Sequence, residues 1–152
     1  KLMIDIGFGD TLEPGAETVH YPVMLDLPAP KIRAYAMETV IAEKFQAMVA
    51  LGRANSRMKD FYDIWILSQS FSIDSERLEK AIAATFARRN TAIPVEPPDA
   101  LTPAFAEDEQ KQRQWRAFVE DVSIDPGSLA QVLEALTGFL IPRAKRAIEL
   151  DQ

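Results

Sequence analysis

The chain of 152 residues contains no cysteine, a single histidine and no long apolar run. Without cysteine there is no disulfide, no thiolate zinc site and no cysteine nucleophile. His20 alone cannot build a histidine metal cage, and it makes a Ser–His–Asp triad very hard to assemble. No stretch approaches the roughly 18 apolar residues of a membrane span, so we expect no membrane partner. Any chemistry must therefore use carboxylates, lysines, arginines and hydroxyls.

The charge balance is acidic, with 17 basic and 23 acidic residues and a net charge of −6. Such a balance argues against bulk electrostatic capture of nucleic acid. Residues 31–59 depart from it, because they hold six basic and only two acidic side chains. A local positive field in an acidic protein fits a small anionic ligand better than a long duplex. Ordinary surface lysines on a solvated helix pair would give the same pattern.

The first 36 residues read as strands and turns. Residues 1–9 alternate apolar and polar positions and end at glycines, which is typical of a strand, and residues 20–27 and 31–36 predict two more. A strand needs neighbours, so we expect the chain to be the C-terminal part of a longer protein. We predict an α+β fold, with domain 1–36 contributing about three short strands and domain 37–152 being helical.

The remainder of the chain has helical periodicity. Apolar residues recur every three or four positions, and glycine, proline and capping residues punctuate them. About five helices are predicted, over residues 37–51, 56–68, 75–89, 107–122 and about 128–150. Ser56 is the expected cap of the second helix, and Pro142 is expected to bend the last. Residues 93–103 carry four prolines and predict a crossing loop.

Three charged positions lie in apolar surroundings. Lys44 flanks the apolar stripe of the first long helix, where it needs an anionic partner or serves as a snorkelling stem. Asp60 and Asp63 share one face of the next helix and are costly there unless paired with cations or metal. Arg57 and Lys59 are the structural partners that could pair with them. Lysine at the edge of a stripe contributes little to stability, so Lys44→Ala is expected to abolish function with the fold intact.

Asp5 stands alone among apolar neighbours in the first predicted strand, next to a glycine turn. Carboxylates in this position are a recurrent way to hold Mg²⁺ against phosphates, because Mg²⁺ prefers a few hard oxygen ligands. A single such aspartate is weak evidence. Together with Lys44 and the Asp60/Asp63 pair it predicts one phosphate-binding cleft.

Three segments carry a family resemblance: residues 4–10 (IDIGFGD), 38–45 (ETVIAEKF) and 57–63 (RMKDFYD). Their spaced motifs resemble the AbiEii/AbiGii-type nucleotidyltransferase-like toxins. The resemblance implies a polymerase-β-like nucleotidyltransferase fold with a helical C-terminal part. It also implies a cytoplasmic bacterial toxin of a toxin–antitoxin or abortive-infection system that transfers nucleotides from an NTP to RNA, with tRNA as the expected acceptor. A cognate antitoxin protein and Mg²⁺ complete the implied partners.

The same resemblance assigns roles by motif. It implies catalytic roles for Asp5, for Lys44 and for one of Asp60 and Asp63, with Asp5 at the metal and Lys44 in contact with the NTP. Arg57 and Lys59 are further candidates for binding the substrate. The sequence lacks the family's Gly-Ser loop followed by an Asp-x-Asp pair. Two-metal phosphoryl transfer needs those carboxylates, so the chain by itself is expected to be inactive.

A rival interpretation is a non-catalytic helical module that binds a protein partner. It predicts an exposed apolar patch around Phe139, Leu140 and Ile141 and no shared site for the charged residues. A general nucleic-acid-binding domain is less favoured, because aromatic and basic residues do not alternate.

Overall fold

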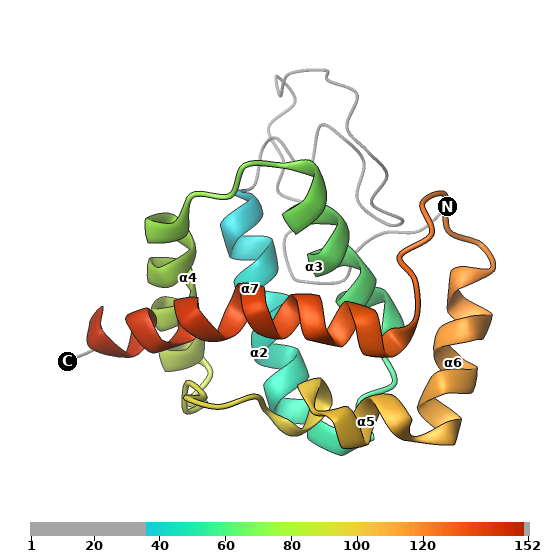
Figure 1. Cartoon of the computed structure of the whole chain (residues 1–152). Coiled ribbons are helices and arrows are strands. Elements are labelled where there is room, and N and C mark those ends of the chain that lie inside the picture. The colour runs from blue at the N-terminus through green and yellow to red at the C-terminus, as the bar shows by residue number, and fades with distance from the viewer. Residues whose placement is uncertain (1–35, 151–152) are drawn as a thin grey trace.

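The computed structural model describes residues 36–150, and every regular element among them is helical (Figure 1). The α-helices are α2 (Met37–Leu51), α3 (Met58–Ser70), α4 (Ser75–Arg88), α5 (Pro103–Glu107), α6 (Glu109–Val119) and α7 (Leu129–Leu150). Two 3₁₀ turns, η1 (Gly52–Ala54) and η2 (Asp99–Leu101), join them. No helix within this part of the chain combines the length and apolarity needed to cross a lipid bilayer.

The helix boundaries follow capping chemistry. Helix α2 ends at Gly52, whose φ of 56° suits glycine and whose N–H donates back to the Met48 carbonyl. Helices α4 and α6 begin after Asp74 and Asp108, and each carboxylate accepts a hydrogen bond from a backbone N–H in the first turn. Helix α5 begins with Pro103, a position where the missing N–H costs nothing.

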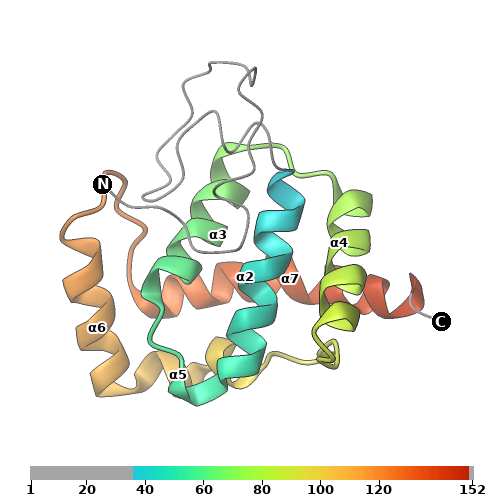
Figure 2. The same cartoon turned by 180° about the vertical axis from the view of Figure 1, so that it is seen from behind.

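The helices form two layers. Helix α2 lies between α3 and α4, and α7 lies across this layer, as the opposite views of Figures 1 and 2 show. Helix α7 packs against α3, α4 and α5, while α6 stands at one end against α3 and α5. The core between them is apolar and aromatic. Phe45 packs on Phe86 at 5.3 Å between ring centroids, and Phe61 packs on Phe105 at 5.7 Å.

The predicted α+β class is wrong: residues 36–150 form an all-helical bundle with no strand among them. The three strands predicted for residues 1–36 fall almost wholly outside the described residues. Ala36, the last residue of the third, is described, and it precedes α2 with no regular structure. The proposed division into domains 1–36 and 37–152 therefore stays a prediction.

Among the helices, α2 matches its predicted bounds, and α3, α4 and α7 shift by one or two residues. Ser56 is not the cap of α3; the residue before that helix is Arg57, without a side-chain cap. The predicted helix 107–122 breaks at Asp108, so that α5 and α6 are separate. Helix α5 was missed because prolines indicate loops, whereas Pro103 here starts a helix.

Candidate functional site

Lys44, Asp60 and Asp63 form a buried ionic cluster between α2 and α3. The Lys44 Nζ lies 3.1 Å from Asp60 Oδ1 and 3.1 Å from Asp63 Oδ2. The three side chains are 1%, 1% and 0% exposed. The helical period explains the arrangement, because Asp60 and Asp63 are one turn apart and turn the same face of α3 toward α2. The structure thus brings together three of the predicted site residues.

Arg57 links this cluster to the surface. Its Nε lies 2.9 Å from Asp60 Oδ2, while 45% of the arginine side chain stays exposed. Two cations and two carboxylates therefore balance, and Arg57 is the exposed member of the four. Burial of an ion pair is tolerated only when charge and hydrogen bonding are compensated in this way. Arg57 is consequently the member of the cluster that a ligand could reach.

The burial of Lys44 corrects the sequence-based view of this residue. A snorkelling lysine keeps its ammonium in water, but here the whole side chain is buried and its ammonium contacts two carboxylates. The positive charge predicted for residues 31–59 is also partly neutralised, because the carboxylates of Asp60 and Asp63 lie just beyond that segment. Lys59 is half-buried on α3. Asp5, Lys31 and Arg33 lie outside the described residues.

Asn55 and Lys111 support the start of α3, and sequence reasoning missed both. Asn55 is fully buried, and its Oδ1 accepts a hydrogen bond from the Arg57 backbone N–H at 2.7 Å. The Lys111 Nζ donates to the Asn55 carbonyl at 2.8 Å and lies 5.3 Å from the centre of the Phe105 ring. The Asx turn at Asn55 is a local signal that could have been found. The role of Lys111 could not, because it is 56 residues away.

Tyr62 adjoins the cluster on α3. Its side chain is buried, and its hydroxyl donates to the Ile124 carbonyl at 3.3 Å. Burial raises the pKa of Tyr62 above its usual value of 10.0, and the neighbouring Asp63 carboxylate raises it further. Tyr62 is therefore neutral at physiological pH and serves as a packing and hydrogen-bonding residue.

The described carboxylates do not fit a magnesium site. No group of three or more histidine or acidic side chains that could hold a metal occurs within residues 36–150. Asp60 and Asp63 share an ammonium at 3.1 Å, which would repel a divalent cation. The metal role predicted for Asp5 concerns a residue outside the described part.

The apolar patch that the rival interpretation requires is not present. Leu140 is fully buried and Ile141 is 7% exposed. Phe139 is half-buried, and the Arg143 guanidinium carbon lies 4.6 Å from the centre of its ring. These residues belong to the face of α7 that covers the bundle. The charged residues do share one site. Both observations count against a simple interaction module.

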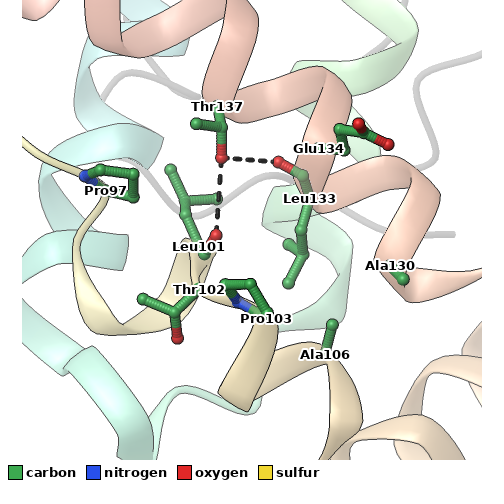
Figure 3. Close-up of a pocket in the computed structure, with 9 residues that line it drawn as sticks. All are labelled: Pro97, Leu101, Thr102, Pro103, Ala106, Ala130, Leu133, Glu134 and Thr137. Atoms are coloured by element: carbon green, nitrogen blue, oxygen red, sulfur yellow. Dashed lines mark hydrogen bonds between the residues drawn. The ribbon is translucent and has the colours of Figure 1, made fainter.

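A separate groove of about 340 Å³ lies between η2, α5 and the first half of α7 (Figure 3). It is mostly apolar, with Leu101, Pro103 and Leu133 among its walls. The Thr137 hydroxyl lies 2.8 Å from the Leu133 carbonyl, within its own helix. Glu134 is the charged residue of the lining. The groove includes none of the predicted site residues.

This arrangement defines a helical domain in which a buried ionic cluster holds one exposed arginine. Residues 1–138 match the family model described as "Nucleotidyl transferase AbiEii toxin, Type IV TA system". The chain belongs to this family, which confirms the resemblance of the three motifs. Membership makes it a nucleotidyltransferase-type toxin of a toxin–antitoxin system and implies a nucleotide substrate and a cognate antitoxin. No curated protein and no solved structure matches the chain.

Proposed function

We propose that this chain is part of a toxin that transfers a nucleotide from an NTP to an RNA acceptor, with tRNA as the expected acceptor, in the bacterial cytoplasm. Family membership supports the reaction class. The observation that carries the site assignment is the link from the buried Lys44 through Asp60 to the exposed Arg57. In this proposal Arg57 contacts the triphosphate of the NTP, and the Lys44–Asp60–Asp63 cluster positions it.

The chemistry requires positive charge at the triphosphate. An RNA hydroxyl oxygen forms a bond to the α-phosphorus, the bond to the departing pyrophosphate breaks, and the hydroxyl loses its proton. Charge is spread over phosphoryl oxygens throughout, so catalysis depends on positioning and electrostatic stabilisation. Arginine is suited to this role, because its planar fork binds two phosphate oxygens at once. Arg57 uses Nε on Asp60 and leaves its terminal nitrogens for a ligand.

The buried residues act through Arg57 in this proposal. The ammonium of Lys44 is already matched by two carboxylates and is 1% exposed, so it does not contact the NTP directly. Asp60 fixes the direction of the guanidinium, and Asp63 balances the charge of Lys44. Lys59, half-buried one turn from Asp63, is proposed as a second cation for the triphosphate.

Arg57→Ala, expressed from the complete open reading frame that encodes the chain, tests this assignment. We expect the kcat/KM for transfer of labelled nucleotide to RNA to fall roughly 100-fold, because one electrostatic contact to the reacting phosphates is lost. Toxicity in a growth assay should fall in parallel. Arg57→Ala removes one of the two cations that compensate the buried Asp60, so its melting temperature should fall, and activity is compared only at temperatures where thermal melts show both proteins folded.

Arg53→Ala is the matched control. Arg53 is exposed in η1, four residues before Arg57, and makes no ion pair among the described residues. Its replacement should leave transfer and toxicity unchanged. Equal loss in both variants, or full activity of Arg57→Ala, would refute the role of Arg57. Absence of transfer from all four NTPs by the wild-type protein would refute the proposed reaction.

A further inference from the structure

Basic side chains gather at one end of the molecule, on α4 and the last part of α7. Residues 75–89 and 143–150 together contain seven basic and three acidic side chains. The basic ones are Arg77, Lys80, Arg88, Arg89, Arg143, Lys145 and Arg146. In both Figure 1 and Figure 2, α4 and this part of α7 lie at the same end. We call these seven residues the basic end.

The opposite end is acidic. Residues 107–125, which include α6, contain six acidic and three basic side chains. Helix α6 lies on the far side of the bundle from α4 in both views (Figures 1 and 2). With Asp74 and Glu43, which lie at the basic end as well, that end still carries an excess of positive charge, so the two ends differ in sign. An anionic partner would be attracted to one end and repelled by the other.

The basic residues of α4 point to solvent along one stripe. Leu78, Ile82 and Phe86 form the buried face of this helix, and helical geometry places Arg77, Lys80 and Arg88 on the other side. Eleven residues separate Arg77 from Arg88, which corresponds to about 16 Å along the helix. A row of cations of this length spans several phosphates of a nucleic-acid strand, which follow one another at about 3.4 Å along the helix axis.

Several of these cations are free to bind. Arg77 and Arg146 are exposed and make no ion pair among the described residues. One further pair lies at the surface, where Lys80 lies 3.6 Å from Glu76 and both are largely exposed; Arg88 and Arg89, by contrast, both contact Glu43, which is only 12% exposed and holds them in place. Surface pairs are worth about 0–1 kcal/mol and exchange readily for a phosphate.

We propose that the basic end binds the phosphate backbone of the RNA acceptor; this inference rests on the proposed function. The alternative of an anionic membrane fits less well. Between the basic residues, the outer face of α4 carries only Ala81, Ala84 and Ala87. An interfacial helix needs large apolar side chains beside its cations. Contact with a backbone alone requires no such residues.

The test is binding of fluorescein-labelled deacylated tRNA, measured by anisotropy over a salt series. In the variant, Arg77→Glu is combined with Arg146→Glu. We expect binding at least tenfold weaker than wild type and a salt slope smaller by about two, because two phosphate contacts are lost. The matched control combines Arg113→Glu with Arg116→Glu, which reverses two exposed cations of α6 and changes the net charge equally. The control should bind within about threefold of wild type.

Three results would overturn the proposal. Equal weakening in both double variants would mean that only net charge matters. Failure of the wild type to bind tRNA at 50 mM salt would exclude the surface altogether. Binding to phosphatidylglycerol vesicles that the Arg77/Arg146 changes abolish, with tRNA binding unaffected, would assign the surface to a membrane. Thermal melts of each variant confirm that the protein measured is folded.

The same variants separate this inference from the proposed function. The Arg77/Arg146 variant should keep the wild-type KM for the NTP and show a raised KM for RNA. Arg57→Ala should bind labelled tRNA as tightly as wild type. If the wild type binds tRNA through the basic end yet transfers no nucleotide, the proposed reaction fails and the binding surface stands.

Discussion

At the scale of single residues, burial decides what Lys44 contributes. The sequence places this lysine at the edge of an apolar stripe and suggests that its loss is harmless to the fold. The structure places it inside, between two aspartates. Lys44→Ala would leave two buried carboxylates with Arg57 as their remaining cation among these four residues. Loss of toxicity in that variant would therefore report unfolding as readily as loss of chemistry.

We predict that Lys44→Ala lowers the free energy of unfolding by about 3–5 kcal/mol, the usual cost of removing one partner of a buried ion pair. Urea unfolding followed by circular dichroism measures it. Lys80→Ala, which disrupts an exposed pair, should cost at most about 0.5 kcal/mol. The combination Lys44→Met, Asp60→Asn and Asp63→Asn removes all three charges and should regain most of the stability. If the triple variant is less stable than Lys44→Ala, buried charge is not the cause.

Tyr62 gives a prediction in alkali. Its folded-state pKa is raised above 10.0 by burial and by Asp63. Above pH 10 the unfolded chain therefore loses this proton while the folded chain keeps it. The stabilising contribution is present below pH 10 and declines above it, by up to about 1.4 kcal/mol per pH unit. Urea unfolding of wild type and Tyr62→Phe at pH 9, 10 and 11 should show the steeper decline in wild type; parallel curves would contradict the assignment.

The candidate site was partly predictable because its pattern is local. The spacing of Asp60 and Asp63 placed both on one face of a helix, and Lys44 stood out within an apolar stripe. Which partner each charge would take depends on how α2 and α3 pack, and the sequence does not encode that locally. Arg57 could be named as a candidate, but its position at the surface end of the cluster required the fold. The contact between Lys111 and Asn55 was invisible for the same reason.

At the scale of elements, the α2 to α4 segment followed its apolar period closely, although Ser56 does not cap α3. Helices α5 and α6 did not follow their sequence signals, because a proline such as Pro103 has two opposite effects. It breaks the interior of a helix, yet it favours the first turn of one. The first-turn position of Pro103 is favoured by the Thr102 hydroxyl, which accepts a hydrogen bond from the Phe105 N–H, and by the packing of Phe105 into the core.

Helix α6 is predicted to be the least protected of the longer helices. Of its side chains only Lys111 and Trp115 are buried, and among the described helices it packs mainly against α3 and α5. Its main tethers are the hydrogen bonds from Lys111 to Asn55 and from Trp115 Nε1 to the Gly127 carbonyl at 2.9 Å. Native-state hydrogen exchange should show amides of α6 exchanging well before those of α2 and α7, because few buried contacts resist local opening. Equal protection in the three helices would contradict this.

At the scale of the whole molecule, the fold class was wrong because the most strand-like patterns occupy residues 1–36, whereas the described residues 36–150 are helical. Alternation over six to nine residues indicates a strand but cannot supply the neighbours that a sheet needs. A helix needs no neighbouring segment for its backbone hydrogen bonds, because they form within the helix itself. The helical part was therefore predictable from local pattern, and the class was not.

The position of α7 has a consequence for how the protein folds during its synthesis. This helix covers α3, α4 and α5 at once, yet among the described helices it leaves the ribosome last. Until then the apolar faces of those three helices lack the cover of α7, and nascent chains with exposed apolar surface are prone to aggregate. Docking of α7 closes the bundle against α3, α4 and α5. Closure of this bundle is therefore expected to wait until α7 has been synthesised.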